Sequence, residues 1–198
     1  MNQKQIWDNI AEEWHEFKKK SSEISLDFLK KQTGKVLDLG SGSGRHLIKI
    51  KNGKMYLVDF SKEMIKLAKQ KSEKEKITAE FRVANLTKLP FEKNFFDSAI
   101  SISAIHCLKP KNHKKAIQEL YRVLKPKAQA LIGVWNKNSK RFKNSPKEKY
   151  IGWRDKGKRY YYLFDEKEIH DLFKKNKFKI ISKQNSELMI RFVIEKGL

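Results

Sequence analysis

The feature that most constrains the fold is a short apolar segment that runs directly into a glycine-rich turn at residues 36–44, Val-Leu-Asp-Leu-Gly-Ser-Gly-Ser-Gly. Its apolar residues predict a buried strand of a parallel sheet, in which both faces are covered. Gly40, Gly42 and Gly44 allow the backbone to turn sharply and to approach a ligand without Cβ atoms in the way. We expect a helix to follow over residues 45–50, with its free N–H groups directed at a ligand on the turn.

The spacing of these glycines separates two classes of cofactor. The dinucleotide fingerprint Gly-x-Gly-x-x-Gly requires a third glycine at position 45, where this chain has Arg45. The observed Gly-x-Gly-x-Gly, with Asp38 two residues before the first glycine, resembles motif I of the class I S-adenosylmethionine-dependent methyltransferases. An acid near the turn suits that cofactor, because it carries an ammonium group and no pyrophosphate. The alternative is an ordinary strand–turn–helix corner without a ligand.

A second strand is predicted at residues 54–59, and it ends in an acid. The carboxylate of Asp59 at its tip can accept hydrogen bonds from both ribose hydroxyls of an adenosine ligand. Phe60 follows, and we expect Ser61 to cap the next helix with Met64 on its inner face. The alternative role for the acid is to end the strand or cap the helix.

A third segment, residues 84–91, resembles the class I stretch in which a polar residue, often Asp, contacts the adenine amino group before Leu-Pro-Phe. Asn85 takes that position, and its amide oxygen can still accept a hydrogen bond from the adenine amine. The alternative is an asparagine that forms a turn after a strand. The resemblance implies S-adenosylmethionine as cofactor, with these candidate binding residues: Asp38, Gly40, Gly42, Asp59, Phe60, Asn85, Leu86 and Ile102.

Strand-like and helical segments alternate along the chain. Helices are predicted at residues 3–19, 22–31, 61–71, 111–124 and 165–176. Further strands are predicted at residues 80–84, 96–103, 128–135, 178–183 and 188–195. This alternation favours an α/β fold with a parallel sheet. With the resemblance, it implies a Rossmann-like class I methyltransferase: a mostly parallel seven-stranded sheet, helices on both faces and an antiparallel C-terminal strand. We expect one domain over residues 1–198, with a basic loop of about 136–160 inserted after the fifth strand.

The charge balance indicates an anionic partner. The chain has 45 Lys and Arg residues against 23 Asp and Glu, a formal net charge of +22, and residues 137–159 hold ten basic and two acidic residues. Such a surplus favours binding to a nucleic acid. A lysine-rich composition without function, or a solvated and partly disordered loop, are the alternatives.

The cysteine content and the hydropathy pattern restrict other classes. Cys107 is the single cysteine, which excludes an intramolecular disulfide and a cysteine-based zinc cage. No apolar run reaches the length of a membrane span, and the N-terminus lacks the apolar core of a signal peptide. We therefore predict no metal and no membrane contact, and a location in the cytoplasm.

Three stretches narrow the resemblance, at residues 96–106, 119–135 and 151–164. They are similar to the methyltransferases that esterify 5-carboxymethyluridine at the wobble position of tRNA. Cys107 stands where that family has a second histidine. The resemblance implies the tRNA anticodon loop as partner and four candidate catalytic residues: His106, which would donate a hydrogen bond to the carboxylate, and Arg154, Arg159 and Tyr160, which would hold the uridine or nearby phosphates.

A carboxylate acceptor is already ionised at neutral pH, so this reaction needs no general base. The resemblance also implies a small zinc-binding activator subunit at the sheet edge formed by the third strand, which carries Phe81 and Val83. Three alternatives remain open: a quinone- or metabolite-type methyltransferase, a methyltransferase of another RNA or of protein, and an RNA-binding protein that retains the cofactor fold without activity. The sequence does not predict an oligomeric state.

Overall fold

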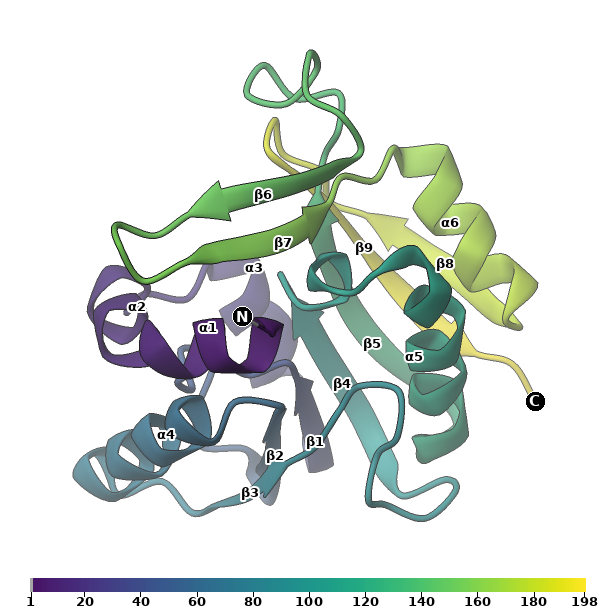
Figure 1. Cartoon of the computed structure of the whole chain (residues 1–198). Coiled ribbons are helices and arrows are strands. Elements are labelled where there is room, and N and C mark those ends of the chain that lie inside the picture. Colours follow the sequence, from purple (N-terminus) through teal and green to yellow (C-terminus); the bar gives the residue numbers. More distant parts are fainter. Residues whose placement is uncertain (1) are drawn as a thin grey trace.

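The computed structural model describes residues 2–198 and contains a seven-stranded sheet with the strand order β3-β2-β1-β4-β5-β9-β8 (Figure 1). Its strands are β1 (Thr33–Leu39), β2 (Lys51–Asp59), β3 (Ala79–Val83), β4 (Phe96–Ile102), β5 (Leu124–Trp135), β8 (Phe178–Lys183) and β9 (Met189–Lys196). The first five strands pair in parallel, whereas β9 is antiparallel to both β5 and β8. The predicted fold class is confirmed.

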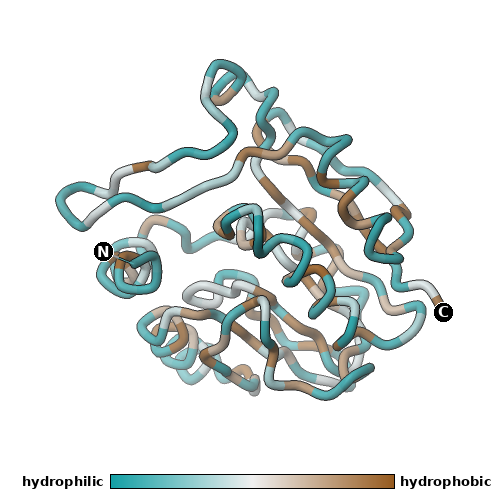
Figure 2. Tube along the Cα trace, turned by 45° about the vertical axis from the view of Figure 1, so that its right-hand side comes forward, coloured by the Kyte–Doolittle hydropathy of each residue, from teal (hydrophilic) through white to brown (hydrophobic). Residues whose placement is uncertain are grey.

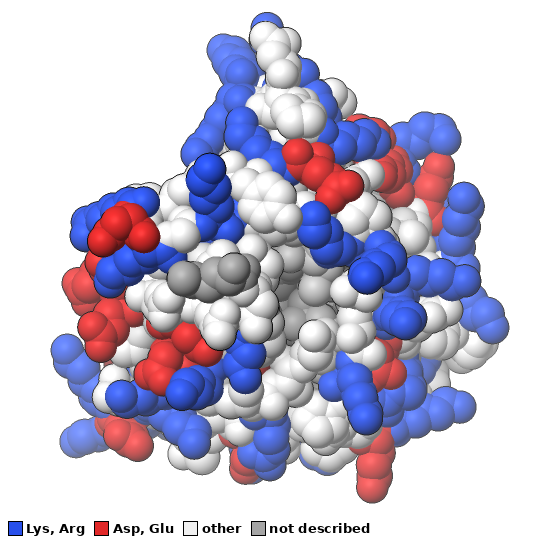
Figure 3. All heavy atoms as spheres, in the orientation of Figure 1, with Lys and Arg blue, Asp and Glu red and all other residues white. Residues whose placement is uncertain are grey.

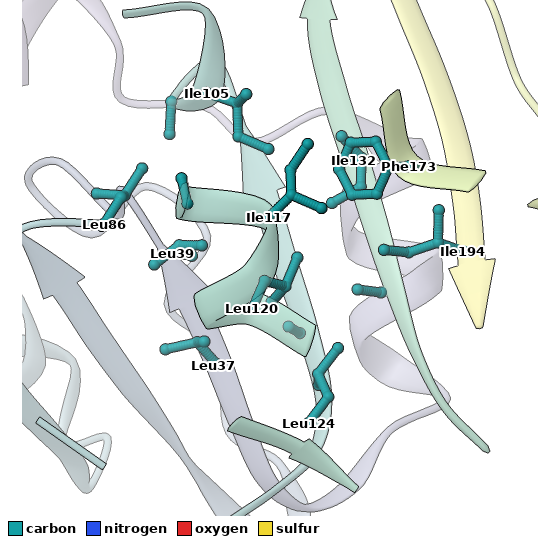
Figure 4. Packing of buried hydrophobic residues seen from close by; sticks show 14 of the residues in the cluster. Leu37, Leu39, Leu86, Ile105, Ile117, Leu120, Leu124, Ile132, Phe173 and Ile194 are labelled. Carbon is teal, nitrogen blue, oxygen red and sulfur yellow. The ribbon is translucent and has the colours of Figure 1, made fainter. Parts of the chain in front are cut away.

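Helices cover both faces of this sheet. They are α1 (Gln3–Asn9), α2 (Ala11–Phe17), α3 (Glu23–Lys30), α4 (Lys62–Glu75), α5 (Pro110–Val123) and α6 (Glu166–Lys175). The alternation of side chains along β1 separates two cores, since Leu37 and Leu39 pack toward α5 and α6 while Val36 packs toward α3 and α4. Figure 4 shows the first core, in which Ile117 of α5 and Phe173 of α6 lie over the sheet. Apolar residues follow the strands, and the segment that projects between β5 and β6 is hydrophilic (Figure 2).

The predicted start of α4 is confirmed in detail. The side-chain oxygen of Ser61 accepts a hydrogen bond from the backbone N–H of Met64 at 3.1 Å, and Met64 is buried. The Asp8 carboxylate accepts a second bond, from the Ser61 hydroxyl at 2.6 Å. This contact fixes the N-terminal helices to the first turn of α4.

The helix predicted over residues 45–50 is absent. The segment makes one turn, with a hydrogen bond from Leu47 N to Gly44 O at 3.1 Å, and then runs extended into β2. The pairing of Thr33 with Lys51 requires the chain to return along the whole length of β1. A seven-residue strand spans about 23 Å, whereas a six-residue helix rises only about 9 Å. The connection is therefore too short to be helical.

Two other predicted boundaries were wrong. The helix expected over 3–19 is divided at buried Ile10, which ends α1 and begins α2. The stretch predicted as a basic loop contains a β-hairpin, formed by β6 (Glu148–Gly152) and β7 (Lys158–Tyr162) in antiparallel pairing. The hairpin lies across α1 and α2 at the carboxyl ends of the parallel strands (Figure 1).

Candidate active site

A cavity opens where β1, β2 and β4 end, and its wall includes the glycine turn. It encloses about 820 Å³, part of which is open to solvent. Seven of the eight predicted cofactor residues line it: Gly40, Gly42, Asp59, Phe60, Asn85, Leu86 and Ile102. Trp7 and Trp14 from the N-terminal helices form the opposite wall. The strand ends thus bring together segments that are 60 residues apart in sequence. We call this space the first cavity.

The glycine turn is held against the tip of β2. Gly42 N donates to Asp59 Oδ2 at 2.9 Å, and Ser61 N donates to Asp59 Oδ1 at 3.0 Å. Gly40 adopts a φ of +76°, and a Cβ there would lie 2.2 Å from the Cβ of Ala104, so only glycine fits. Burial raises the pKa of the Asp59 carboxyl to about 6, against the opposing effect of the two backbone donors.

Asp38 is the predicted cofactor residue that does not line the first cavity. Its side chain is fully buried behind the turn, and both carboxylate oxygens lack a hydrogen-bond partner among residues 2–198. The nearest basic atom is Nδ1 of His46, 3.5 Å from Asp38 Oδ2. A buried carboxylate without donors is costly. A nearby positive charge would therefore stabilise the Asp38 carboxylate, although the wall of the first cavity lies between this side chain and the cavity.

Asn85 lines the first cavity as predicted, and its side chain also forms the turn that was the alternative role. Its Oδ1 accepts hydrogen bonds from Thr87 N and from the Thr87 hydroxyl, each at 2.9 Å. Both lone pairs of the amide oxygen are thus engaged, which contradicts the expectation that this oxygen is free for an adenine amine. The amide N–H groups make no hydrogen bond in the described chain and can still donate.

A second cavity adjoins the first, and the two share Trp7, Trp14, Lys18, Arg45, Ile102 and Ser103 as lining residues. The remainder of its wall includes residues from distant segments: His106 after β4, Trp135 at the end of β5, Tyr161 in β7 and Arg191 in β9. The rings of Trp135 and Tyr161 stack at 4.3 Å between centroids. A flat group that entered this space would lie next to whatever occupied the first cavity.

His106 is the single candidate catalytic residue that lines either cavity. It lies in a 3₁₀ turn (Ile105–Cys107), is fully buried, and accepts a hydrogen bond at Nδ1 from Trp135 N at 2.9 Å. That bond assigns the proton to Nε2, which has no partner among residues 2–198. Burial lowers the pKa of His106 to about 3, so the ring is a neutral donor across the physiological range.

Cationic side chains line the second cavity, and the negative charge of Asp38 acts to raise the pKa of one of them, Arg45. Lys18, Arg45 and Arg191 line it, and none of them forms an ion pair in the described structure. Burial lowers the pKa of each, and the proximity of Arg45 lowers that of Lys18 further. Unpaired cations in a partly buried space favour an anionic ligand. Sequence reasoning missed all three in this role, because they come from separate segments and share no motif.

The other three candidate catalytic residues lie outside both cavities. Arg154 is exposed in the hairpin turn and pairs with Glu13 at 3.3 Å. Tyr160 points to the opposite face of β7 from Tyr161, and its hydroxyl donates to Glu148 at 2.8 Å. Arg159 is buried behind the cavity wall and donates to the Tyr161 hydroxyl at 2.7 Å. These positions contradict the expectation that Arg154, Arg159 and Tyr160 hold the acceptor directly.

Known proteins share both the sequence pattern and the fold. Residues 36–127 match the family described as a methyltransferase domain. A tRNA (carboxymethyluridine(34)-5-O)-methyltransferase from Schizosaccharomyces pombe is 31% identical over 157 residues, which are 75% of this chain and 66% of the relative. The chain therefore carries an S-adenosylmethionine-dependent methyltransferase domain. The enzyme of the same name from Arabidopsis thaliana is 39% identical to this methyltransferase over 101 residues, 50% of this chain and 24% of that enzyme.

The chain spans about a quarter of the length of the Arabidopsis relative and about two thirds of the length of the Schizosaccharomyces relative. Its fold matches a chain from the complex between the Haloferax volcanii Trm112 methyltransferase activator and a methyltransferase, with a TM-score of 0.78. The match covers 100% of this chain and 98% of that chain at 16% identity, and it shows the fold alone.

Proposed function

We propose that this protein transfers the methyl group of S-adenosylmethionine to the carboxylate of a carboxymethyl-modified uridine at the wobble position of tRNA. The observation that carries the proposal is the second cavity. It combines three unpaired cations, a neutral Nε2–H donor and stacked aromatic rings next to the candidate cofactor cavity. The cations suit a carboxylate, the rings suit a flat base, and the similarity to wobble-uridine methyltransferases supports the same acceptor.

The first cavity fits the cofactor of the family. The glycine turn leaves open space beside Gly42, where a Cβ would meet only Met64 Sδ at 4.0 Å, and Asp59 can accept hydrogen bonds from ribose hydroxyls. We assign the adenine to the wall formed by Asn85 and Leu86, with the asparagine acting as a donor. Asp38 contributes its negative charge to the cationic cofactor from behind the wall.

The residues around His106 then need only to orient the acceptor and exclude water. When bound, S-adenosylmethionine supplies an electrophilic methyl group. Arg191 and Lys18 hold the acceptor carboxylate, and His106 Nε2 donates a hydrogen bond to it. No side chain has to remove a proton, because the carboxylate is already ionised. A neutral histidine with a pKa of about 3 suits a positioning donor better than a base.

The charge distribution supports tRNA as the carrier of the uridine. Lysine and arginine side chains dominate the face shown in Figure 3, and the segment between β5 and β6 projects from it with basic side chains. That segment is anchored close to the second cavity, since buried Phe142 stacks on Trp135 at 4.9 Å and Arg141 lies 5.6 Å from the same ring. RNA phosphates on this projection would place a loop nucleotide near the cavity.

An activator subunit at the β3 edge is also part of the proposal. β3 pairs with β2 on one side alone and is an edge of the sheet. Val83 is 49% exposed there and Phe81 is half-buried, so the edge presents apolar area and unpaired backbone groups. We further propose that residues 1–198 act as one domain and that the protein works in the cytoplasm with its tRNA. No helix among residues 2–198 is long and apolar enough to cross a membrane.

Three acceptors test the function directly. Anticodon stem–loops that carry 5-carboxymethyluridine, its uncharged carbamoylmethyl analogue or plain uridine are incubated with the protein and labelled cofactor. We expect a methyl ester on the carboxymethyl nucleoside alone, identified by mass spectrometry of the digested RNA. Methylation of the two uncharged RNAs, or of a quinone in place of the RNA, would reject the carboxylate assignment in favour of the alternative acceptors.

The assignment of Asp59 predicts a pH-dependent cofactor affinity. Ribose hydroxyls donate to the ionised carboxylate, so protonation below its pKa of about 6 should weaken binding by about tenfold per pH unit. Asp59→Asn should raise the dissociation constant by a factor equivalent to about 1.5–3 kcal/mol at pH 7.5 and should abolish this pH dependence. Calorimetry between pH 7.5 and 5 measures both quantities. A folded variant that binds like the wild type at every pH would remove Asp59 from the ribose site.

A further inference from the structure

One large aromatic side chain remains exposed at the rim of the two cavities. Phe17, at the end of α2, is 62% exposed. Its ring packs edge-on against Trp153 in the hairpin turn, with centroids 5.4 Å apart, and lies 5.9 Å from Trp14. The indole N–H of Trp153 donates to Glu13 Oε2 at 2.6 Å, which fixes the orientation of this support. Contacts with Trp14 and Trp153 therefore hold the exposed Phe17 ring in place.

The Phe17 ring lies next to residues that line the second cavity. Trp14 and Lys18, the neighbours of Phe17 in space and in sequence, line both cavities. The Lys18 ammonium lies 4.8 Å from the centroid of the Phe17 ring. Arg154 and Lys156 of the hairpin turn both pair with Glu13, the carboxylate that also accepts the Trp153 N–H. A ligand that enters the second cavity would pass next to an exposed aromatic face bordered by cations.

We propose that Phe17, supported by Trp153, is a stacking platform for the base of the nucleotide adjacent to the methylated uridine. The inference rests on the proposed function, and it adds that the enzyme reads two neighbouring unstacked nucleotides. An exposed aromatic ring next to cations matches single-stranded RNA, whose bases stack on the ring while phosphates meet the ammonium and guanidinium groups. An uncharged apolar protein segment would leave Lys18, which forms no ion pair among residues 2–198, without a partner.

This arrangement has a consequence for the form of the substrate. The base next to the target must leave its own stack in order to lie on Phe17, so a loop nucleotide fits and a paired one does not. The platform accepts any base, since every base has an aromatic face. The ring therefore selects an open RNA conformation and leaves the identity of the neighbouring base free.

The test uses anticodon stem–loops with the fluorescent base 2-aminopurine on either side of the modified uridine. We expect the emission of one of the two labels to change on binding to the wild type and to Phe17→Tyr, which keeps the ring. Phe17→Leu keeps the apolar area but removes the ring, so it should lose that change and bind the RNA about tenfold more weakly or worse. Ile181→Ala, which alters an exposed apolar residue of β8, should behave like the wild type.

The readouts separate this inference from the proposed function. Equal emission and equal RNA affinity in the wild type and Phe17→Leu would overturn the platform, even when the RNA is methylated. A ring-dependent emission change with no methylation of any carboxymethylated RNA would overturn the proposed function and support the platform.

Discussion

Replacing His106 by alanine is expected to lower single-turnover methyl transfer to carboxymethylated tRNA by about 10²–10³-fold, the effect of removing one positioned donor. The Nε2–H of this ring is the buried donor in the second cavity, and Trp135 N fixes its tautomer. Cofactor affinity should change little, because His106 lines the second cavity and not the first. The wild-type rate should also stay constant from pH 8 to 6.5, since the ring stays neutral well above its pKa of about 3.

Two controls accompany this variant. Alanine leaves Trp135 N without its acceptor, so thermal unfolding of each protein must show that it is folded at the assay temperature. His106→Gln retains a side-chain N–H and should recover part of the rate. Equal rates in the wild type and His106→Ala would remove the residue from the mechanism. A steep fall of the wild-type rate below pH 7, absent in the variant, would make it a base and favour a hydroxyl or amine acceptor.

Arg191→Met is expected to lower kcat/KM for carboxymethylated RNA by about 10–150-fold, the equivalent of one hydrogen bond to a charged group. The Arg191 side chain lines the second cavity and forms no ion pair with any of residues 2–198, and methionine keeps much of its length while removing the charge. Lys18→Met should have an effect of the same kind, and the two together should leave a low activity that no longer distinguishes the carboxylate from its amide analogue.

Lys167→Met provides the control for Arg191→Met, because Lys167 is an exposed cation of α6 that pairs with Asp171 and lines neither cavity. Steady-state kinetics with both the carboxymethyl and the carbamoylmethyl RNA separate loss of charge recognition from loss of general RNA binding. If Arg191→Met slows both substrates equally, the arginine holds the RNA backbone and not the acceptor carboxylate.

Local sequence signals predicted the elements that carry a motif within a few residues. The β2 tip is one case, where Asp59, Ser61 and Met64 take the expected positions because capping and strand-end chemistry are local. The absent helix at residues 45–50 is the opposite case. The turn after β1 was predicted correctly from its glycines. The distance that the chain must then cover depends on the register between β1 and β2, which no local pattern contains.

The second cavity could be predicted only in part, since its wall is assembled from six separate segments between Trp7 and Arg191. His106 was identified through its position after β4, whereas Lys18, Arg45 and Arg191 have no spacing in common. In β7 the sequence predicted Tyr160 as a catalytic residue and did not separate it from Tyr161 as a ring that stacks on a base, whereas the register of the hairpin turns Tyr161 toward the cavity. A one-residue difference in a strand exchanges the two faces, so this choice requires the pairing with β6.

The two cavities differ in where their walls lie along the chain. The residues assigned to the cofactor fall between Asp38 and Ile102, inside the region that matches the methyltransferase domain family. Trp135, Tyr161 and Arg191, which line the second cavity and not the first, come from beyond that region, whereas Trp7 and Lys18 come from before it and line both cavities. Substrate choice can therefore change, in evolution or in the laboratory, by exchange of the flanking segments around an unaltered methyl-donor module. New acceptor-binding segments introduced in this way would use the same methyl donor, and the glycine turn assigned to that donor would not need to change.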